Sequence, residues 1–203
     1  MRRFDPTQGP RAGLYAHFRR FAQPSFTLCA PVRVDSARLK REGGLFPNLL
    51  WAAMEAGNAV PELRQRVRVE DGREWVVEHA QLDCTCTVAR EDGSFTFCSF
   101  FRDADRQRFI AQVPRSIEAA TGAEGLDLSQ QHRDDMLYLS SIPWRDISAV
   151  VHAASGDPLD CVPRLMWGRV EGDRLTMCVT AHHALVDGVH VARFWEAFEG
   201  FVG

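Results

Sequence analysis

The sequence has no excess of basic residues. Its 24 lysines and arginines are outnumbered by 27 aspartates and glutamates, and the formal net charge is −3. A protein that holds a nucleic-acid backbone needs a positive surface, so this balance argues against nucleic acid as a partner. It leaves room for a small anionic ligand, because a local cluster of arginines does not show in the total charge.

Long apolar runs are also absent. No stretch approaches the roughly 20 apolar residues of a membrane span. The first residues, MRRFDPTQGP, carry two arginines but no apolar run behind them, unlike a secretory signal. We therefore expect a cytoplasmic protein that does not use a membrane as a partner.

Cysteines in metal-binding spacing are missing. Zinc sites favour C-x-x-C pairs with a second pair downstream, whereas only Cys84 and Cys86 lie close together here. We therefore predict no metal site, and we expect the cysteines to be free thiols, most of them buried. They are Cys29, Cys84, Cys86, Cys98, Cys161 and Cys178.

The chain likewise lacks internal repeats, low-complexity blocks and linkers rich in proline or glycine. We therefore expect a single domain over residues 1–203. No glycine-rich phosphate loop opens a predicted helix, which disfavours nucleotide-binding folds. The composition, 45% hydrophobic and 25% charged, is typical of a soluble globular protein.

Hydrophobic periodicity predicts both strands and helices. Residues 82–89 alternate strictly between apolar and polar side chains, which indicates a half-buried strand. In the helix predicted over 45–60, Pro47 lies in the first turn and Pro61 ends the helix. The predicted strands cover 26–34, 82–89, 94–101, 137–144 and 174–183, and the predicted helices cover 45–60, 103–120 and 189–201.

Two local signals complete this prediction of the fold. Asp71-Gly72 lies between two β-rich runs and predicts a hairpin. Pro114 lies inside a predicted helix, where it removes a backbone donor and should cause a kink. Strands that follow one another in hairpin fashion favour a mixed sheet. The fold class is therefore α/β in the broad sense, an α+β two-layer sandwich with a mixed β-sheet covered by helices.

The segment AHHALVDGVH, residues 181–190, contains the strongest candidates for functional residues. Strand alternation places His182 and His183 on opposite faces, so only one of them can face a given cleft. In a purely structural interpretation, the histidines end a strand, Asp187 caps the next helix and Gly188 takes a left-handed conformation. The full H-H-x-x-x-D-G array is more specific than a lone histidine and favours a functional site.

The array closely resembles the signature of the chloramphenicol acetyltransferases, whose H-H-x-x-x-D-G core is shared with dihydrolipoamide acyltransferases and peptide-synthetase condensation domains. Further segments resemble this family over nearly the whole chain, and the chain length and the C-terminal position of the motif match. The resemblance implies a chloramphenicol acetyltransferase-like fold. The further segments are LFPNLLWAAMEAGNAVPELRQRV, TFCSFF (96–101) and SSIPW (140–144).

The resemblance also implies a chemistry. Such enzymes move an acetyl group from acetyl-CoA to a hydroxyl of a small acceptor in one ternary complex, without a tightly bound cofactor. His183 matches the general base, a role that suits an imidazole because its ordinary pKa of about 6.5 lies near working pH. Asp187, followed by Gly188, matches the support of the histidine turn. The family is a homotrimer, and each site takes its histidine from one subunit and much of its acceptor pocket from the next.

The oxyanion-stabilising serine of the family is not found at the position that the resemblance implies. Within PWRDISAV, the expected position is Ala149, and Ser148 lies one residue earlier. Either Ser148 takes the role after a one-residue shift, or the donor is lost. A one-residue shift in a strand reverses the direction of the side chain, and loss of one donor costs about 10²–10³ in turnover.

The arginine that pairs with Asp187 in the family is also displaced. The expected position is Leu14, and Arg11 can serve if a short insertion follows it. Without an arginine the carboxylate would fall back on capping the helix, since an unpaired buried carboxylate is costly. Phe21 and Phe97 match aromatic positions that line the acceptor pocket, with core packing as the alternative. The family's aromatic hydroxyl is missing at Phe21, which argues against chloramphenicol itself as the natural acceptor.

Three functions remain open at this point. The first is a CoA-dependent O-acyltransferase that acts on a small, chloramphenicol-like hydroxylated acceptor. The second, motivated by Ala149 and Leu14, is a catalytically weak homologue that binds a small molecule or a protein partner. The third is an acyltransferase that takes its acyl group from a carrier protein instead of free CoA.

Overall fold

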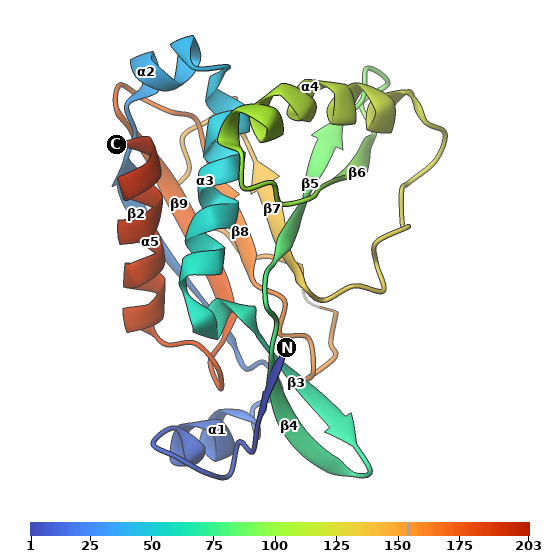
Figure 1. Ribbon diagram of the computed structural model, residues 1–203, viewed down its shortest axis with the longest axis vertical. Coiled ribbons are helices and arrows are strands. Elements are labelled where there is room, and N and C mark those ends of the chain that lie inside the picture. The colour runs from blue at the N-terminus through green and yellow to red at the C-terminus, as the bar shows by residue number, and fades with distance from the viewer. Residues whose placement is uncertain (154) are drawn as a thin grey trace.

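The computed structural model describes residues 1–153 and 155–203 (Figure 1). All the helices and strands predicted above are present, with shifts at their ends. In chain order the elements are β1 (Arg2–Phe4), α1 (Ala12–Phe18), β2 (Ser25–Arg33), α2 (Ser36–Arg41), α3 (Leu45–Ala59), the 3-10 helix η1 (Pro61–Arg64), β3 (Gln65–Glu70), β4 (Arg73–Glu78), β5 (Asp83–Ala89), β6 (Phe95–Phe100), α4 (Arg106–Gly122), β7 (Met136–Ser141), β8 (Arg164–Trp167), β9 (Arg174–His182) and α5 (Gly188–Val202).

The larger sheet has six strands in the order β2-β9-β8-β7-β5-β6. β5 pairs with β7 and β7 with β8 in parallel, whereas β2–β9, β8–β9 and β5–β6 are antiparallel. The prediction of a mixed sheet is therefore confirmed. β2 is an edge strand, and its antiparallel partner β9 leads directly into the histidine motif.

Helices α3, α4 and α5 cover one face of this sheet and form the second layer (Figure 1). Strand alternation produces the core: in β5, Cys84 and Cys86 are buried, while Thr85 and Thr87 between and after them are only half-buried. The side chains of Thr85 and Thr87 therefore lie on the face that the helices leave uncovered. We call this face of the six-stranded sheet the open face.

A second, three-stranded sheet has the order β1-β4-β3 and was not expected as a separate sheet. Its hairpin turn is the predicted one, with Asp71 and Gly72 at φ of 51° and 71°. The buried Arg66 of β3 fastens this sheet to the larger one, since its guanidinium donates to the carbonyls of Met136 (2.9 Å) and Asp134 (2.7 Å). Burial lowers the pKa of Arg66 to about 10.

The expectation of free thiols is wrong for one pair. Cys29 and Cys178 form a disulfide, and the other cysteines are free and buried. The physical reason is the register of β2 and β9, which makes the two residues direct antiparallel partners with their Cα atoms 4.0 Å apart. Both side chains lie on the open face, because their neighbours Leu28, Met177 and Val179 pack into the core on the other face.

The remaining differences concern proline and short elements. β7 ends at Ser141, before the predicted end of this strand. Pro143 and its neighbours form a turn instead. α4 runs on through Pro114 to Gly122, beyond the predicted end. The elements missed from the sequence are β1, α1, α2, η1 and β8, most of them too short to show a hydrophobic period.

Candidate active site

The histidine turn follows β9 directly and is fixed by backbone hydrogen bonds. The carbonyl of His182 accepts from the N–H groups of Leu185 and Val186, both at 3.0 Å. The N–H of His183 donates to the carbonyl of Pro24 (2.9 Å), which precedes the neighbouring strand β2. These bonds place the side chain of His183 at the end of the sheet, next to the segment that joins α1 to β2.

Aromatic rings hold the imidazole of His183. The ring of Phe18 stacks on it with centroids 3.8 Å apart and an interplanar angle of 9°, and Phe26 lies 4.4 Å away. Nδ1 of His183 is buried and lies 3.3 Å from Oδ1 of Asp187, without the geometry of a hydrogen bond. Since the side chain is 31% exposed, its accessible part lies elsewhere on the ring. Nε2 is thus the nitrogen open to a substrate.

Asp187 stands behind His183 and is paired with Arg11. The guanidinium of Arg11 donates to both carboxylate oxygens, with NH2 at 3.2 Å from Oδ1. These hydrogen bonds hold the pKa of Asp187 below its ordinary value. Arg11 directly precedes α1, whose last residue is Phe18, so one short helix delivers both the partner of the carboxylate and the ring that stacks on His183.

Helix α5 begins at the other side of the turn. The N–H of Asp187 donates to Nδ1 of His190 (2.9 Å), and Nε2 of His190 lies 3.6 Å from Oε1 of Glu62. Gly188 is the first helical residue and does not have a positive φ, so the expected left-handed conformation is wrong. The reason is that the helix begins immediately after Asp187, and the backbone of Gly188 already belongs to its first turn.

His182 is buried and has other neighbours than His183, since Arg19 lies near its ring whereas Phe18 and Phe26 lie against His183. Nδ1 of His182 accepts from the N–H of Ala184 (3.2 Å), so the proton of the neutral ring lies on Nε2. Burial, with help from Arg19, lowers the pKa of His182 to about 4. The imidazole is therefore neutral at pH 7 and acts as part of the turn.

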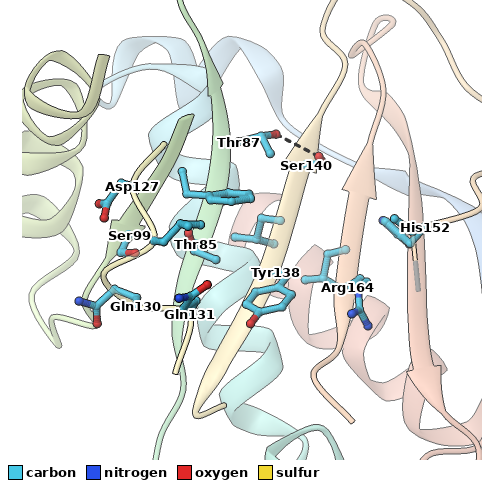
Figure 2. A pocket seen from close by; sticks show the side chains of 15 residues that line it. Thr85, Thr87, Ser99, Asp127, Gln130, Gln131, Tyr138, Ser140, His152 and Arg164 are labelled. Atoms are coloured by element: carbon cyan, nitrogen blue, oxygen red, sulfur yellow. Dashed lines mark hydrogen bonds between the residues drawn. The ribbon is translucent and has the colours of Figure 1, made fainter. Parts of the chain in front are cut away.

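A cavity of about 490 Å³ opens on the open face, over β6, β5, β7 and β8 (Figure 2). In this view Thr87 and Ser140 face each other at one end, with their hydroxyl oxygens 3.1 Å apart. Gln130, Gln131 and Tyr138 lie at the other end. The remaining lining residues are Thr85, Phe97, Ser99, Asp127, Leu128, Leu139, His152, Ala153, Arg164 and Leu165.

A smaller cavity of about 140 Å³ adjoins it toward β2. It shares His152, Ala153 and Arg164 with the first cavity, and its wall includes Pro24, the residue that accepts the N–H of His183. The two cavities therefore share part of their walls, and the smaller one reaches Pro24 beside the histidine turn.

The predicted pocket residues separate into two places. Phe97 lines the large cavity, whereas Phe21 packs against His17 and Phe18, with centroids 5.0 Å and 5.3 Å away. Ser148 is exposed in the loop after β7 and lines neither of the two cavities described. The structure thus groups His183, Asp187 and Arg11, and it does not bring Ser148 to them.

Ser140 carries a hydroxyl that the resemblance to the family did not single out. It lies in the same SSIPW segment and lines the large cavity opposite Thr87. A signal was available in the sequence, since Leu137 and Leu139 are apolar and alternation across them turns Tyr138 and Ser140 to the other face. The resemblance implies a serine after Trp144, and Ser140, which precedes Trp144, was therefore not predicted.

Within residues 1–153 and 155–203, no three His, Cys, Asp or Glu side chains gather in a way that could hold a metal ion. Among the helices of that same part of the chain, none has the length and apolar character needed to cross a bilayer.

Comparisons with known proteins identify the family of this chain. The model of the chloramphenicol acetyltransferase family matches residues 2–199. The chloramphenicol acetyltransferase of Campylobacter coli is 23% identical over 202 residues, which cover 97% of this chain and 96% of that protein.

Solved structures show the same fold. A chloramphenicol acetyltransferase superposes with a TM-score of 0.83 at 23% identity, covering 98% of both chains. The dihydrolipoamide acetyltransferase of Azotobacter vinelandii gives a TM-score of 0.64 at 14% identity, covering 92% of this chain and 84% of that one. The family model, matched over almost the entire length, decides the assignment. The chain belongs to the chloramphenicol acetyltransferase family and is an acyltransferase that acts on a small molecule.

Proposed function

We propose that this protein transfers an acyl group, in the first instance acetyl, from acyl-CoA to a hydroxyl of a small molecule, with His183 as the general base. The observation that carries the proposal is the arrangement behind the imidazole. Asp187, paired with Arg11, lies on the Nδ1 side, and Phe18 covers one ring face. Nε2 is left open to a substrate.

The proposed reaction needs one proton carrier. Nε2 of His183 takes the proton of the acceptor hydroxyl while its oxygen attacks the thioester carbonyl. The carbon–sulfur bond then breaks, the CoA thiolate leaves, and the imidazolium returns the proton to the sulfur. A positioned imidazole contributes about 10²–10⁴ in rate to such a step. The nearby carboxylate of Asp187 favours the imidazolium that forms.

A distant relative supports the choice of these two residues. In the dihydrolipoamide acetyltransferase of Azotobacter vinelandii, a serine, a histidine and an asparagine have been investigated for their role in the catalytic mechanism. That asparagine follows the histidine by four residues, the same spacing that separates Asp187 from His183. In both chains a polar residue therefore follows a histidine by four positions.

The oxyanion donor has two candidates. Ser148 is the candidate that the resemblance to the family implies, and its role as the donor stays a prediction. Ser140 is favoured by its place, since its hydroxyl lies in the wall of the large cavity and is oriented by Thr87. We therefore propose Ser140 as the donor, with Ser148 as the alternative that the experiment below includes.

We also propose that the site is shared between subunits of a homotrimer. The base and its support lie at the end of β9, whereas Phe97 and Ser140 lie on strands β6 and β7, across the sheet. In such an assembly the histidine turn of one subunit would meet the cavity of its neighbour. A shared cleft lets a short chain enclose two substrates.

The test is release of free thiol from acetyl-CoA in the presence of chloramphenicol or other hydroxylated acceptors. His183→Ala should lower kcat by about 10²–10⁴. Ser140→Ala should lower it by about 10²–10³, and Ser148→Ala should change it little. His132→Ala, at an exposed histidine outside both cavities, is the matched control.

Equal background rates for wild type and His183→Ala with every acceptor would contradict the proposed function. A large loss in Ser148→Ala with none in Ser140→Ala would return the oxyanion role to Ser148. Activity with an acylated carrier protein but not with acetyl-CoA would change the donor and keep the chemistry.

A further inference from the structure

Helix α5 begins with an interaction that is sensitive to protonation. Asp187 precedes the first helical residue, and its N–H donates to Nδ1 of His190 in the first turn, at 2.9 Å. Glutamate or glutamine ordinarily accepts this N–H at the same position of a helix. An imidazole nitrogen can accept only while it carries no proton. The hydrogen bond at the start of α5 therefore exists with a neutral His190 and is lost with a charged one.

A carboxylate on a neighbouring element fixes the tautomer of this ring. With Nδ1 as the acceptor, the proton of the neutral imidazole lies on Nε2. Nε2 lies 3.6 Å from Oε1 of Glu62, and the side chain of His190 is only 8% exposed. Oε2 of Glu62 is buried and has no hydrogen-bond partner within residues 1–153 and 155–203. The negative charge of Glu62 therefore favours the proton on Nε2, which leaves Nδ1 free to accept.

The fold brings these side chains to the support of the base. Glu62 lies in η1, directly after α3, and α3 ends at the same end of the helical layer where α5 begins (Figure 1). Asp187 is consequently held at two points, since His190 binds its backbone N–H and Arg11 binds its carboxylate. Oδ1 of this carboxylate lies 3.3 Å from Nδ1 of His183. A movement of the Asp187 backbone would therefore also move the group behind the base.

Charged groups from three parts of the fold act on His190. Glu62 lies near it on η1, and Arg11 lies near it in the segment before α1. Asp187 and Arg193 are its neighbours along the chain. Burial is the largest influence and lowers the pKa of His190, against the opposing effect of Glu62. The ring is therefore neutral at pH 7 and takes up a second proton only in more acidic solution.

We propose that His190 is a positioning residue for the base: neutral and held by Glu62, it fixes the backbone of Asp187, and it releases this hold on taking up a proton. The inference rests on the proposed acyl transfer for the role of His183 as the base. It adds a second group whose protonation stops turnover, because both imidazoles must be neutral in the active enzyme. His190 acts only through Asp187, since it is buried and lines neither of the two cavities described.

The first test compares turnover in two variants of His190. His190→Leu removes the acceptor and should lower kcat for acetyl transfer by about 10- to 100-fold at pH 7, as expected from a small displacement of a catalytic group. His190→Gln supplies an oxygen that accepts the N–H of Asp187 without titrating, and it should recover most of that loss. His132→Gln, at an exposed histidine outside both cavities, is the matched control.

The second test is the pH profile of kcat/KM between pH 8 and pH 5. Wild type should lose activity more steeply than His190→Gln, because only wild type has to keep two imidazoles neutral. The ratio of their kcat/KM values should fall by at least about 3-fold across this range. The other histidines are present in both proteins and cancel in this ratio. Parallel profiles, or a loss in His190→Gln as large as in His190→Leu, would overturn the inference.

A measurement without turnover separates this inference from the proposed function. In His183→Ala, the nitrogen-15 NMR signal of the Asp187 amide should shift with pH, and the double variant with His190→Gln should not show this shift. The carboxylate of Asp187 does not interfere, because its pKa is held below its ordinary value. An amide that does not respond to pH would overturn the inference. A responding amide, with thiol release no faster in wild type than in His183→Ala, would instead overturn the acyl transfer alone.

Discussion

At the scale of single residues, the support of His183 comes from both ends of the chain. Asp187 lies only four residues beyond the histidine, while Arg11 and Phe18 come from the first twenty residues. The carboxylate is about a quarter exposed, so the ion pair with Arg11 orients more than it stabilises. An imidazole fixed in this way needs little reorganisation when it takes up a proton.

Replacing Arg11 by methionine should therefore affect turnover more than folding. Arg11→Met leaves Asp187 without its partner, and we expect kcat/KM for acetyl transfer to fall by about 10- to 100-fold. The free energy of unfolding in urea should fall by only about 1 kcal/mol, since both groups are partly solvated. Arg20→Met, at an exposed arginine shortly after α1, is the control. Unchanged turnover in Arg11→Met would show that Arg11 does not support His183.

His182 makes a prediction about acid stability. Its pKa, lowered to about 4 by burial, lies below the 6.5 of the unfolded chain, so the unfolded state binds more protons between these values. The stabilising effect is complete above pH 6.5 and is lost as the pH falls toward 4. For a shift of this size the loss is about 3 kcal/mol.

The free energy of unfolding, measured at intervals from pH 7 to pH 4, should therefore fall less steeply in His182→Gln than in wild type. His152 and His190 also have lowered pKa values, and they act in the same direction in both proteins. Their effects cancel in the difference. If the two pH profiles have the same slope, His182 is not the buried neutral group described above.

At the scale of elements, α3 lies against the sheet at a glycine. A Cβ on Gly57 would come within 2.5 Å of the side chain of Leu137 in β7, and Leu137 is fully buried. The helix and the strand can approach this closely only because position 57 has no side chain. By contrast, a Cβ on Gly200 in α5 would meet nothing within 4 Å.

These two glycines should respond in opposite directions to the same substitution. Gly57→Ala should destabilise the protein by about 1–3 kcal/mol, because the buried leucine must move within a packed core. Gly200→Ala should stabilise it by about 0.5–1 kcal/mol through higher helix propensity. Thermal unfolding of both variants measures the difference, and a stabilised Gly57→Ala would contradict the close contact.

The elements also show what the sequence reveals and what it hides. Long segments with a clear period, such as α3 and β5, were predicted within a few residues because hydrophobic spacing alone defines them. β8, four residues long, carries too few positions to show a period. The disulfide was missed for a different reason: the pairing of β2 with β9 joins segments 149 residues apart in the sequence.

The candidate site, like the fold, could be predicted only in part from the sequence. His183 and Asp187 could be singled out because they lie in one short motif. Arg11 could be proposed as the partner only through the resemblance, and the structure now shows the contact. The contact of His152 with Thr180 could not be predicted, because nothing local in the sequence shows that a loop places this histidine there.

At the scale of the whole molecule, the shared site of the proposed trimer can be tested by complementation. Thr85→Trp should fill the cavity, and His183→Ala removes the base, so each variant alone should be inactive. In mixed trimers, an intact cavity can meet an intact histidine from the neighbouring chain. We expect about a quarter of the sites to be active after refolding an equal mixture, measured by thiol release. No recovered activity would place base and cavity in the same subunit.

We also propose that residues 1–203 unfold as one domain. Arg66 joins the smaller sheet to the backbone before and within β7, so neither sheet can open without exposing its buried guanidinium. Calorimetry should therefore show a single cooperative transition. Two separate transitions would instead define the β1-β4-β3 sheet as an independent unit.

The bond between Cys29 and Cys178 has a topological consequence. It closes the backbone into a covalent ring, residues 29–178, with two free tails, 1–28 and 179–203. Every residue that lines the large cavity belongs to the ring. His183, with all the side chains that hold it, belongs to the tails. In the oxidised chain, the covalent ring therefore contains the cavity. The two terminal segments outside the ring come together to position His183.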